Sequence, residues 1–439
     1  MHPRITVIGG GLAGTEAAWQ LAQRGLPVTL CEMRPVRTTD AHQTDRLAEL
    51  VCSNSLKSDQ HPSASWLLKE ELRRLDSLLL RAAAESRVPG GHALTVDRVA
   101  FATAISDAIE SHPGIEIRRE EITEIDPSRP TVIATGPLTS DALAVSIGRL
   151  TGSQRLFFYD SISPIVDATT VDRTIAFPAS RHDKSLDGTG DYLNCPLSKP
   201  EYERFVDELI AAATVEAHIP NDTPYFEACL PIEEIARRGR DTLRFGPMKP
   251  TGLTDPRTGK WPYAAVQLRQ ENLRADSYNL VGFQNHLRFP EQKRILRLIP
   301  GLEAAEFLRY GQIHRNTYIN SPALLDATLR LKDHPAIFFA GQISGVEGYV
   351  ESIATGLAAG LLAAAQLTGQ AVRPFPRETA IGSLCHYISH ADPRYYQPAN
   401  VAFDLFPPLD RSPRDRAERQ AAVCRRALAS LEEYICVHV

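Results

Sequence analysis

The sequence predicts an α/β fold in which a Rossmann-like nucleotide-binding domain is interrupted by a smaller α+β insertion domain. Three observations predict it: a glycine-rich turn between a strand and a helix near the N-terminus, two later strands that end in glycine, and a change in composition between those strands. A chain of 439 residues corresponds to roughly two or three domains. We expect the nucleotide-binding domain in residues 1–180 and 310–439, and the insertion in residues 181–309.

The N-terminal segment has the order of a dinucleotide-binding βαβ unit. An apolar stretch typical of a buried strand is followed by a glycine turn, an apolar-periodic helix, a second strand and an acidic residue. These elements are residues 5–8, Gly9–Gly14, residues 13–24, residues 28–30 and Glu32. A G-x-G-x-x-G turn alone is weak evidence, but with both strands and an acid about 20 residues further on it predicts nucleotide binding.

Each residue of this turn has a physical role. Gly9 makes the tight turn, Gly11 lets a pyrophosphate approach the backbone, and Gly14 allows the helix to pack against the strand. The helix N-terminus carries about half a positive charge, which favours phosphate. Glu32 is expected to accept a hydrogen bond from a ribose with a free 2′-hydroxyl, as in FAD or NAD. The other turn residues expected to contact the nucleotide are Gly10, Leu12 and Ala13.

Two later segments favour FAD over NAD. The strand from Thr131 ends in Ala-Thr-Gly136, and the strand at 336–339 is followed by Gly341, Gln342 and Gly348 and by a helix of small residues. This arrangement is typical of flavoproteins, because the second helix would place its N-terminus near the flavin and stabilise the reduced ring. Within that helix, we expect the small residues of 356–365 to serve close packing.

The charge is unevenly distributed along the chain. The whole sequence has a net charge of −5, yet residues 229–297 contain thirteen Lys and Arg against seven Asp and Glu, so this window is +6 and the remainder −11. A basic segment on an acidic body suggests a confined anionic partner such as a folded RNA. The alternative is a solvated loop region without a ligand.

Composition and motifs exclude several classes of protein. The chain is 43% hydrophobic and 23% charged, as in ordinary globular proteins, and no apolar run is long enough for a membrane span. No secretory signal is recognised, and seven scattered cysteines are expected to be reduced, so we predict a cytoplasmic protein. No metal site is expected, because His386 and His390 lack the Glu of H-E-x-x-H. Amphipathic helices are predicted at 63–81 and 414–434.

Two cysteines lie in unusual settings. Cys52 is in a polar loop soon after the ribose-binding acid, and Cys229 stands at the start of the basic window. Nearby Arg or Lys can lower the pKa of a thiol by ~2 units and so activate it as a nucleophile. Buried packing is the alternative for either cysteine. A flavoprotein disulfide reductase is disfavoured because no two cysteines are close in the sequence.

Several motifs together resemble the TrmFO family of folate- and FAD-dependent tRNA (uracil-5-)-methyltransferases. The related, longer GidA flavoproteins share mainly the glycine turn and the general architecture. The matching segments cover essentially the whole chain, and one of them reads Gln284-Asn-His286 where Gln-Thr-His is expected. They are residues 9–18, 31–35, 50–57, 134–139, 226–231, 281–286 and 341–349.

The resemblance implies a specific reaction. The enzyme would make 5-methyluridine at the T-loop uridine of tRNA (U54), taking a methylene carbon from 5,10-methylenetetrahydrofolate and electrons from NAD(P)H through FAD. Uracil C5 becomes nucleophilic after a thiolate adds to C6, so an activated cysteine is required. The resemblance implies Cys229 as the attacking thiol and Cys52 as a second thiol near the flavin, although the two assignments can be exchanged. It implies that His286 stacks on the pterin, and no obligate protein partner is evident.

Three other functions stay open on the sequence alone. The same chemistry could act on a uridine of ribosomal RNA. A flavin oxidoreductase of small molecules would make the basic insertion incidental. A flavin-containing RNA-binding scaffold would bind RNA without turnover.

Overall fold

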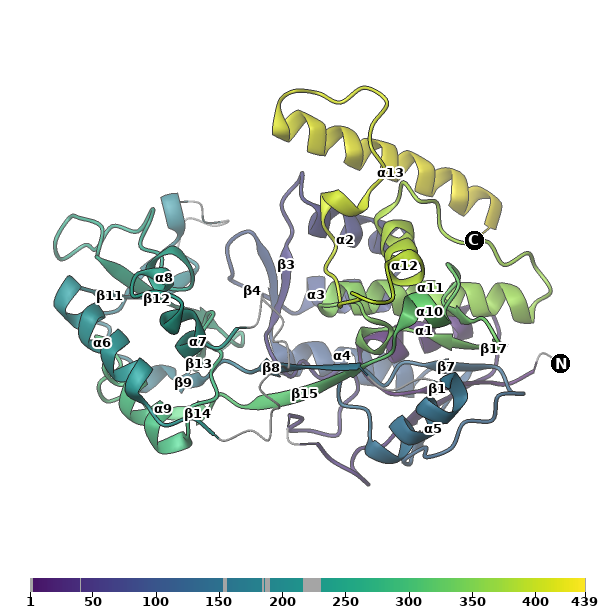
Figure 1. The fold of residues 1–439 in the computed structure, drawn as a ribbon, viewed down its shortest axis with the longest axis horizontal. Coiled ribbons are helices and arrows are strands. Elements are labelled where there is room, and N and C mark those ends of the chain that lie inside the picture. The colour runs from purple at the N-terminus through teal and green to yellow at the C-terminus, as the bar shows by residue number, and fades with distance from the viewer. Residues whose placement is uncertain are drawn as a thin grey trace.

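The protein has two lobes joined by a two-stranded ribbon (Figure 1). This computed structural model describes residues 3–39, 41–152, 156–183, 185, 190–215 and 230–438, apart from the side chains of residues 156–161 and 313–315. The larger lobe contains both ends of the chain, and the smaller lobe contains the middle.

The larger lobe is built on a six-stranded sheet in the order β16-β17-β7-β1-β2-β6. All neighbours pair in parallel except β16, which is antiparallel to β17. The chain winds outward in both directions from the β1–β7 pair, and ligands of doubly wound sheets bind at such a switch point. The strands are β1 (Ile5–Ile8), β2 (Val28–Glu32), β6 (Ile115–Arg119), β7 (Thr131–Ile133), β16 (Arg330–Leu331) and β17 (His334–Phe339).

Helices α1 (Leu12–Gln23) and α11 (Tyr349–Leu367) pack unusually closely on each other. A Cβ atom on Gly356 would overlap the backbone of Ala13, and one on Gly360 would lie 2.9 Å from the carbonyl oxygen of Ala17. The prediction that these small residues serve close packing is therefore confirmed. Among the described helices, α11 alone has the length and apolar character of a membrane span, but most of it is buried in this packing.

The helix predicted at 63–81 is wrong in one respect, because the structure has two helices there: α2 (Ala64–Arg74) and α3 (Leu78–Glu85). Asp76 turns the chain with a φ of 54°, and the Ser77 hydroxyl accepts from the backbone N–H of Leu80 to begin α3. The apolar periodicity hid this break because both helices bury leucines against the same core.

The remaining elements of the larger lobe complete its outer layers. The predicted C-terminal helix is present as α13 (Arg416–His438), which packs on α2 and lies along the top of the lobe in Figure 1. A small antiparallel sheet has the order β3-β5-β4. The elements not yet given are β3 (Ser55–Ser58), β4 (Arg87–Val88), β5 (Ala93–Val96), α4 (Arg98–Glu110), α5 (Asp141–Thr151), α10 (Ser321–Leu324) and α12 (Ala380–His390).

The smaller lobe has its own antiparallel sheet, in the order β10-β11-β12-β13-β9-β14, and its own apolar core. Its strands are β9 (Ile165–Asp167), β10 (Phe177–Ala179), β11 (Tyr192–Leu197), β12 (Ala264–Gln270), β13 (Ser277–Leu280) and β14 (Phe307–Arg309). Its helices are α6 (Lys199–Ala211), α7 (Ile232–Arg237), α8 (Thr242–Phe245) and α9 (Phe289–Leu296). Separated strands and helices of this kind form the α+β architecture expected of the insertion.

The two lobes are connected by β8 (Leu156–Ser161) and β15 (Ile313–Tyr318), which pair antiparallel (Figure 1). The second sheet already includes β9 and β10, which precede residue 181, and it ends with β14. Both early strands are three residues long, too short for a periodic signal. The division at residues 181 and 309 stays a prediction, and the sheet topology favours a first boundary nearer residue 162.

The close packing of α1 and α11 can be tested with Gly356→Ala. We expect the free energy of unfolding to fall by roughly 1–3 kcal/mol, because the added methyl group overlaps the backbone of Ala13. Helix propensity alone predicts the opposite sign, a gain of about 1 kcal/mol. Urea unfolding followed by circular dichroism measures the change, with Gly148→Ala at a half-buried position of α5 as the control. A Gly356→Ala protein as stable as the parent would contradict this packing.

Candidate active site

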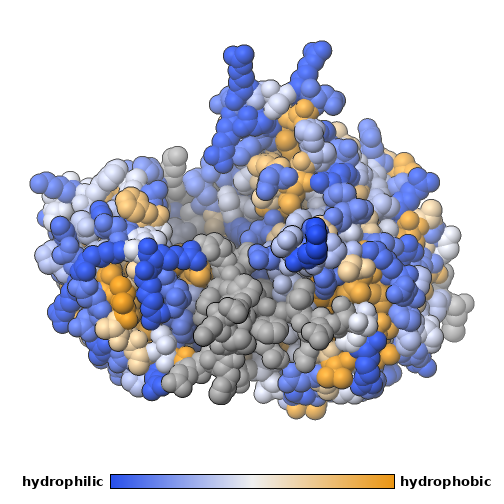
Figure 2. Space-filling view, in the orientation of Figure 1, coloured by the Kyte–Doolittle hydropathy of each residue, from blue (hydrophilic) through white to orange (hydrophobic). Residues whose placement is uncertain are grey.

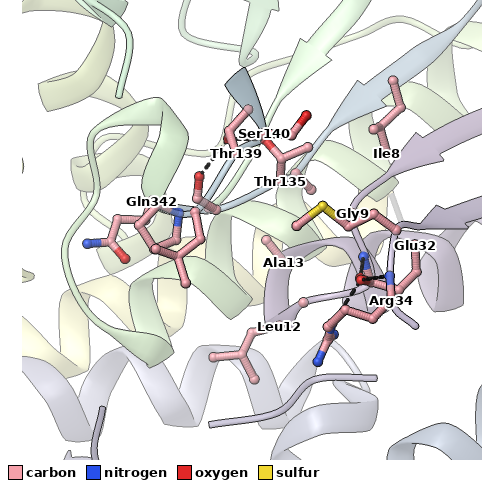
Figure 3. Close-up of a pocket in the computed structure, with 18 of the residues that line it drawn as sticks. Ile8, Gly9, Leu12, Ala13, Glu32, Arg34, Thr135, Thr139, Ser140 and Gln342 are labelled. Carbon is pink, nitrogen blue, oxygen red and sulfur yellow. Dashed lines mark hydrogen bonds and ion pairs between the residues drawn. The ribbon is translucent and has the colours of Figure 1, made fainter. Parts of the chain in front are cut away.

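A cavity of about 980 Å³ lies at the switch point, where β1 and β7 end. Figure 3 shows its wall, with residues from the glycine turn on one side and from the segment after β7 on the other. The predicted residues that line it are Gly9, Gly10, Gly11, Leu12, Ala13, Glu32, Gly136, Gly341 and Gln342.

The glycine turn forms the floor of this cavity. Gly9 has a φ of 107°, and a Cβ atom there would lie 2.5 Å from the carbonyl oxygen of Ala134. Gly11 precedes the first residue of α1, and a Cβ atom there would meet no protein atom within 4 Å, so its backbone faces open space. Gly14 does not line the cavity, since a Cβ atom there would overlap the carbonyl oxygen of Gly9. The turn therefore leaves room for a phosphate at the positive end of α1.

Glu32 is the acidic group of the cavity and is held by a network of hydrogen bonds. Its Oε2 accepts from the N–H of Gly10 at 2.8 Å, and its Oε1 accepts from the backbone N and Nε of Arg34 at 3.0 and 2.9 Å (Figure 3). Burial alone would raise the pKa of Glu32, but these bonds and the Arg34 charge lower it below its ordinary value. An ionised carboxylate with a fixed orientation is suited to accept a ribose hydroxyl.

The opposite wall is formed by the ends of β7 and β17. The hydroxyl groups of Thr135 and Thr139 lie 2.6 Å apart, and the N–H of Gly341 donates to Thr355 Oγ1 at 2.9 Å. Gln342 Nε2 donates to Glu347 Oε2 at 2.6 Å. The first turn of α11 thus faces the same cavity as the first turn of α1.

A second cavity of about 1040 Å³ adjoins the first. The two share the wall residues Val51, Pro137, Leu138, Gln342 and Tyr349, so they lie side by side. The second cavity holds two more of the predicted site residues, the thiol-bearing Cys52 and the glycine at the start of α11, Gly348. Its other lining residues are Ala41, Ser53, Ser55, Lys57, Ile162, Gln284, Asn316, Glu347 and Asn400.

The loop that carries Cys52 is tied to α11. The backbone N–H groups of Cys52 and Ser53 donate to the hydroxyl oxygen of Tyr349, at 2.8 and 3.0 Å. Burial raises the pKa of this tyrosine far above its ordinary value, so the hydroxyl stays protonated at neutral pH. Arg98 Nη2 donates to the carbonyl oxygen of Cys52 at 3.4 Å, which brings a positive charge near this half-buried thiol.

The smaller lobe holds the same loop from the other side. Arg269 donates to Asn54 Oδ1 through Nε and to Ser53 Oγ through Nη2, both at 2.8 Å. Asn54 Nδ2 in turn donates to the carbonyl oxygen of Gln270 at 2.9 Å. Arg98 of the larger lobe pairs with Glu271 of the smaller lobe. The position of Cys52 therefore depends on both lobes.

A wider cleft of about 1900 Å³ is lined by residues of both lobes and meets the first cavity at Arg34, His42 and Glu49. Burial, with the nearby charge of Arg34, lowers the pKa of His42 to about 4. This imidazole is consequently neutral at pH 7. The cleft adjoins the first cavity from the side where the two lobes meet.

Among the described residues, the predicted His286 is not brought into either cavity. His286 is 8% exposed in the smaller lobe, where its backbone N–H donates to Glu233 Oε1 at 2.8 Å. Gln284, two residues earlier, does line the second cavity. Cys229 lies outside the described residues. The pterin role of His286 and the nucleophilic role of Cys229 stay predictions.

Ion pairs neutralise much of the charge in the basic window. The exposed face of the smaller lobe, at the left of Figure 2, is largely hydrophilic. Of the cations, Lys249, Lys260 and Lys293 are exposed and have no ion pair among the residues that the structure describes. The pairs are Arg237–Glu234, Arg240–Asp207, Arg244–Asp241, Arg257–Asp255, Arg274–Asp276 and Arg294–Glu208.

Some site residues were not singled out from the sequence. Arg34, Lys57 and Tyr349 all lie in segments that carry the resemblance, but the pattern gave no role to them. Asn400 belongs to no recognised motif and reaches the second cavity from the C-terminal region. No three His, Cys, Asp or Glu side chains among the described residues form a group that could hold a metal ion.

The chain is similar to known proteins over its whole length. The family model described as "Glucose inhibited division protein A" matches residues 4–371. The methylenetetrahydrofolate--tRNA-(uracil-5-)-methyltransferase TrmFO of Solibacter usitatus is 69% identical, with 99% of each chain covered. The proteins of the same name from Koribacter versatilis and Natranaerobius thermophilus are 61% and 54% identical, over 99% and 98% of this chain and 98% and 99% of theirs. The chain belongs to the TrmFO family. The resemblance predicted from the motifs is confirmed.

Solved structures confirm the predicted fold class. Aquifex aeolicus GidA superimposes with a TM-score of 0.70 at 17% identity, covering 99% of this chain and 75% of that protein. A second crystal form of the same protein gives 0.69, covering 79% of it. At this identity the likeness concerns the fold alone. In this TrmFO-family chain, the first cavity lies at the switch point of that fold's parallel sheet.

Glu32→Gln should weaken FAD binding by ~10- to 100-fold, the range expected when charge-assisted hydrogen bonds are lost. The amide would present an N–H group either to Gly10 N or to Arg34, where the carboxylate accepts from both. Titration of FAD-free protein, followed by quenching of flavin fluorescence, measures the affinity. Glu116→Gln on the surface of β6 is the matched control, because Glu116 lines neither cavity. An unchanged affinity for the Glu32 variant would refute the assignment.

Proposed function

We propose that this chain catalyses the folate-dependent C5-methylation of the T-loop uridine of tRNA. The observation that carries the proposal is its 69% identity, over essentially the whole chain, to a methylenetetrahydrofolate--tRNA-(uracil-5-)-methyltransferase. The methylene group comes from 5,10-methylenetetrahydrofolate and the reducing equivalents from NAD(P)H. We expect the enzyme to act in the cytoplasm, where its tRNA substrate is found.

The residues of the first cavity fit FAD. Gly11 leaves open space where a pyrophosphate would approach, and Glu32 offers an ionised acceptor to a ribose hydroxyl. The first turn of α11 lines this cavity through Tyr349 and Ser352 and would contribute a positive dipole to a bound cofactor. When bound, FAD supplies the redox chemistry and the one-carbon transfer that protein side chains lack.

The second cavity fits the reacting pyrimidine. A thiolate that adds to C6 of uracil makes C5 nucleophilic, and Cys52 lines this cavity beside the first one. Hydrogen bonds from its own loop to Tyr349, together with the contact from Arg98, hold the cysteine in place. We assign the attack on uracil to Cys229 and the second role to Cys52. The position of Cys52 in the second cavity supports its part in this assignment.

The wide cleft between the lobes supports access for a folded RNA. The target uridine would have to leave the T-loop to reach the second cavity, as in other enzymes that act on a base. The exposed Lys249, Lys260 and Lys293 would contact phosphates. This route requires no membrane and no additional protein.

The reaction itself is tested with purified protein, methylenetetrahydrofolate, NADPH and a T-loop transcript. We expect 5-methyluridine in the tRNA but not in a ribosomal RNA fragment, and tRNA binding that weakens steeply with salt because phosphate contacts dominate it. Nucleoside mass spectrometry measures the product. Bound FAD without 5-methyluridine would refute the proposal, and methylation of the ribosomal fragment alone would move the reaction to that RNA.

The roles of the two thiols are tested with Cys229→Ala and Cys52→Ala. We expect each variant to retain FAD and to lose methylation by ~10³-fold or more, because nucleophilic and proton-transfer steps both need the thiol. Only Cys229→Ala should fail to form a covalent complex with T-loop RNA that contains 5-fluorouracil, as seen by mass spectrometry. Cys436→Ala, at an exposed position of α13, is the control. A covalent complex that persists in Cys229→Ala and vanishes in Cys52→Ala would exchange the roles.

A further inference from the structure

Lys57 is the cationic side chain that lines the second cavity. It lies in β3, five residues after Cys52, and its side chain is 36% exposed toward this space. It does not line the first cavity. A positive charge in the wall of a cavity that also holds a thiol has no role in the chemistry described so far.

The ammonium group of Lys57 is anchored by two acceptors. Nζ lies 2.7 Å from Oε1 of the completely buried Glu351 in the first turn of α11, and it also donates to Oδ1 of Asn400. Glu351 Oε1 accepts a further bond from the N–H of Val401 at 3.1 Å. Among the described residues, two of the three N–H donors of Nζ are used in this way, which leaves one for a ligand.

The backbone around Lys57 is also held in place. Lys57 has a φ of 62°, a left-handed conformation that is uncommon for residues with a side chain. The fully buried Lys69 donates to the carbonyl oxygens on either side of it, those of Leu56 at 3.0 Å and Ser58 at 2.7 Å. An unfavourable conformation that the surrounding structure enforces is typical of functional positions.

The absence of a side chain at Gly348 makes room for this arrangement. A Cβ atom on Gly348 would lie 2.6 Å from Nζ of Lys57 and would overlap Oε2 of Glu351. The glycine that begins α11 therefore permits the ion pair to reach the cavity wall. Three segments distant in the sequence converge on this one ammonium group: β3, the start of α11 and the loop at Asn400.

We propose that Lys57 is a catalytic residue that donates a hydrogen bond to the 4-carbonyl oxygen of the target uridine, with Glu351 as its positioning residue. The inference rests on the proposed function. When the thiolate forms its bond to C6, the electron pair of the C5=C6 bond moves toward C4, and negative charge develops on O4. A fixed ammonium group at O4 stabilises this enolate without giving up its proton. The pair then returns through C5, which forms a bond to the incoming methylene carbon, while an electron pair of that carbon's bond to its carrier nitrogen moves onto the nitrogen.

The cavities favour the uridine over the flavin as the recipient of this hydrogen bond. Lys57 lines the space that contains Cys52, whereas the residues of the glycine turn and Glu32 line the other cavity. Reduced flavin has a similar anionic pyrimidine ring, so the experiment must separate the two. The flavin midpoint potential would report a contact between Lys57 and the flavin. The rate of covalent complex formation with RNA would report a contact between Lys57 and the uridine.

The test uses the FAD-loaded full-length enzyme and the variants Lys57→Met and Lys57→Arg. For Lys57→Met we expect normal FAD content and an unchanged flavin midpoint potential. The rate of covalent complex formation with 5-fluorouracil T-loop RNA should fall by ~10²- to 10³-fold, as for other lost donors to a developing oxyanion. The KM for tRNA should change little, because the interaction strengthens only as charge develops. Lys57→Arg should recover part of the rate, since it keeps the charge.

Two further variants keep the result interpretable. Lys57→Met leaves Glu351 buried without its cation, so the double variant Lys57→Met/Glu351→Gln removes both charges and should show the same slow complex formation. Lys199→Met, on the surface of α6, should behave as the parent enzyme. A normal rate of complex formation in both Lys57→Met proteins would overturn the proposal, as would a shifted potential with a normal rate. A parent enzyme that retains FAD but forms no complex would overturn the proposed function and this inference together.

Discussion

The close contact between α1 and α11 is the constraint on which the site depends. Because Gly356 and Gly360 have no side chains, the two helices approach until their backbones nearly touch at Ala13 and Ala17. Their first turns then face the same space at the switch point, although they are separated by most of the sequence. The glycine turn at the start of α1 forms one end of the cavity, and the first turn of α11 forms the other. A single bulky residue in this contact would separate the two.

The position of Cys52 depends on a short loop that both lobes hold. Tyr349 binds the backbone at Cys52 from the larger lobe, while Arg269 binds Ser53 and Asn54 from the smaller one. The ion pair of Arg98 with Glu271 adds a charged link between the lobes. The thiol is thus placed by tertiary contacts and not by the local structure of the loop.

What could be predicted from the sequence is local in origin. Gly9 to Gly14 and Glu32 act within one βαβ unit, so their spacing predicted both the fold class and the first cavity. The break at Asp76 was missed because apolar periodicity continues across it, and β9 and β10 were missed because three residues give no period. The contacts of Lys57 with Glu351 and Asn400 could not be predicted, since these residues meet only after the chain has folded.

The contacts between Arg269 and the cysteine loop have a consequence for exchanging the two lobes between proteins. The side chain of Arg269 in the insertion is matched to the amide and hydroxyl groups of Asn54 and Ser53 in the other lobe. A chimaera that joins this insertion to a larger lobe without these two acceptors must therefore carry the cysteine loop with it. Otherwise the imported lobe would leave a buried guanidinium without acceptors. The two lobes each have their own core, but these contacts couple them structurally.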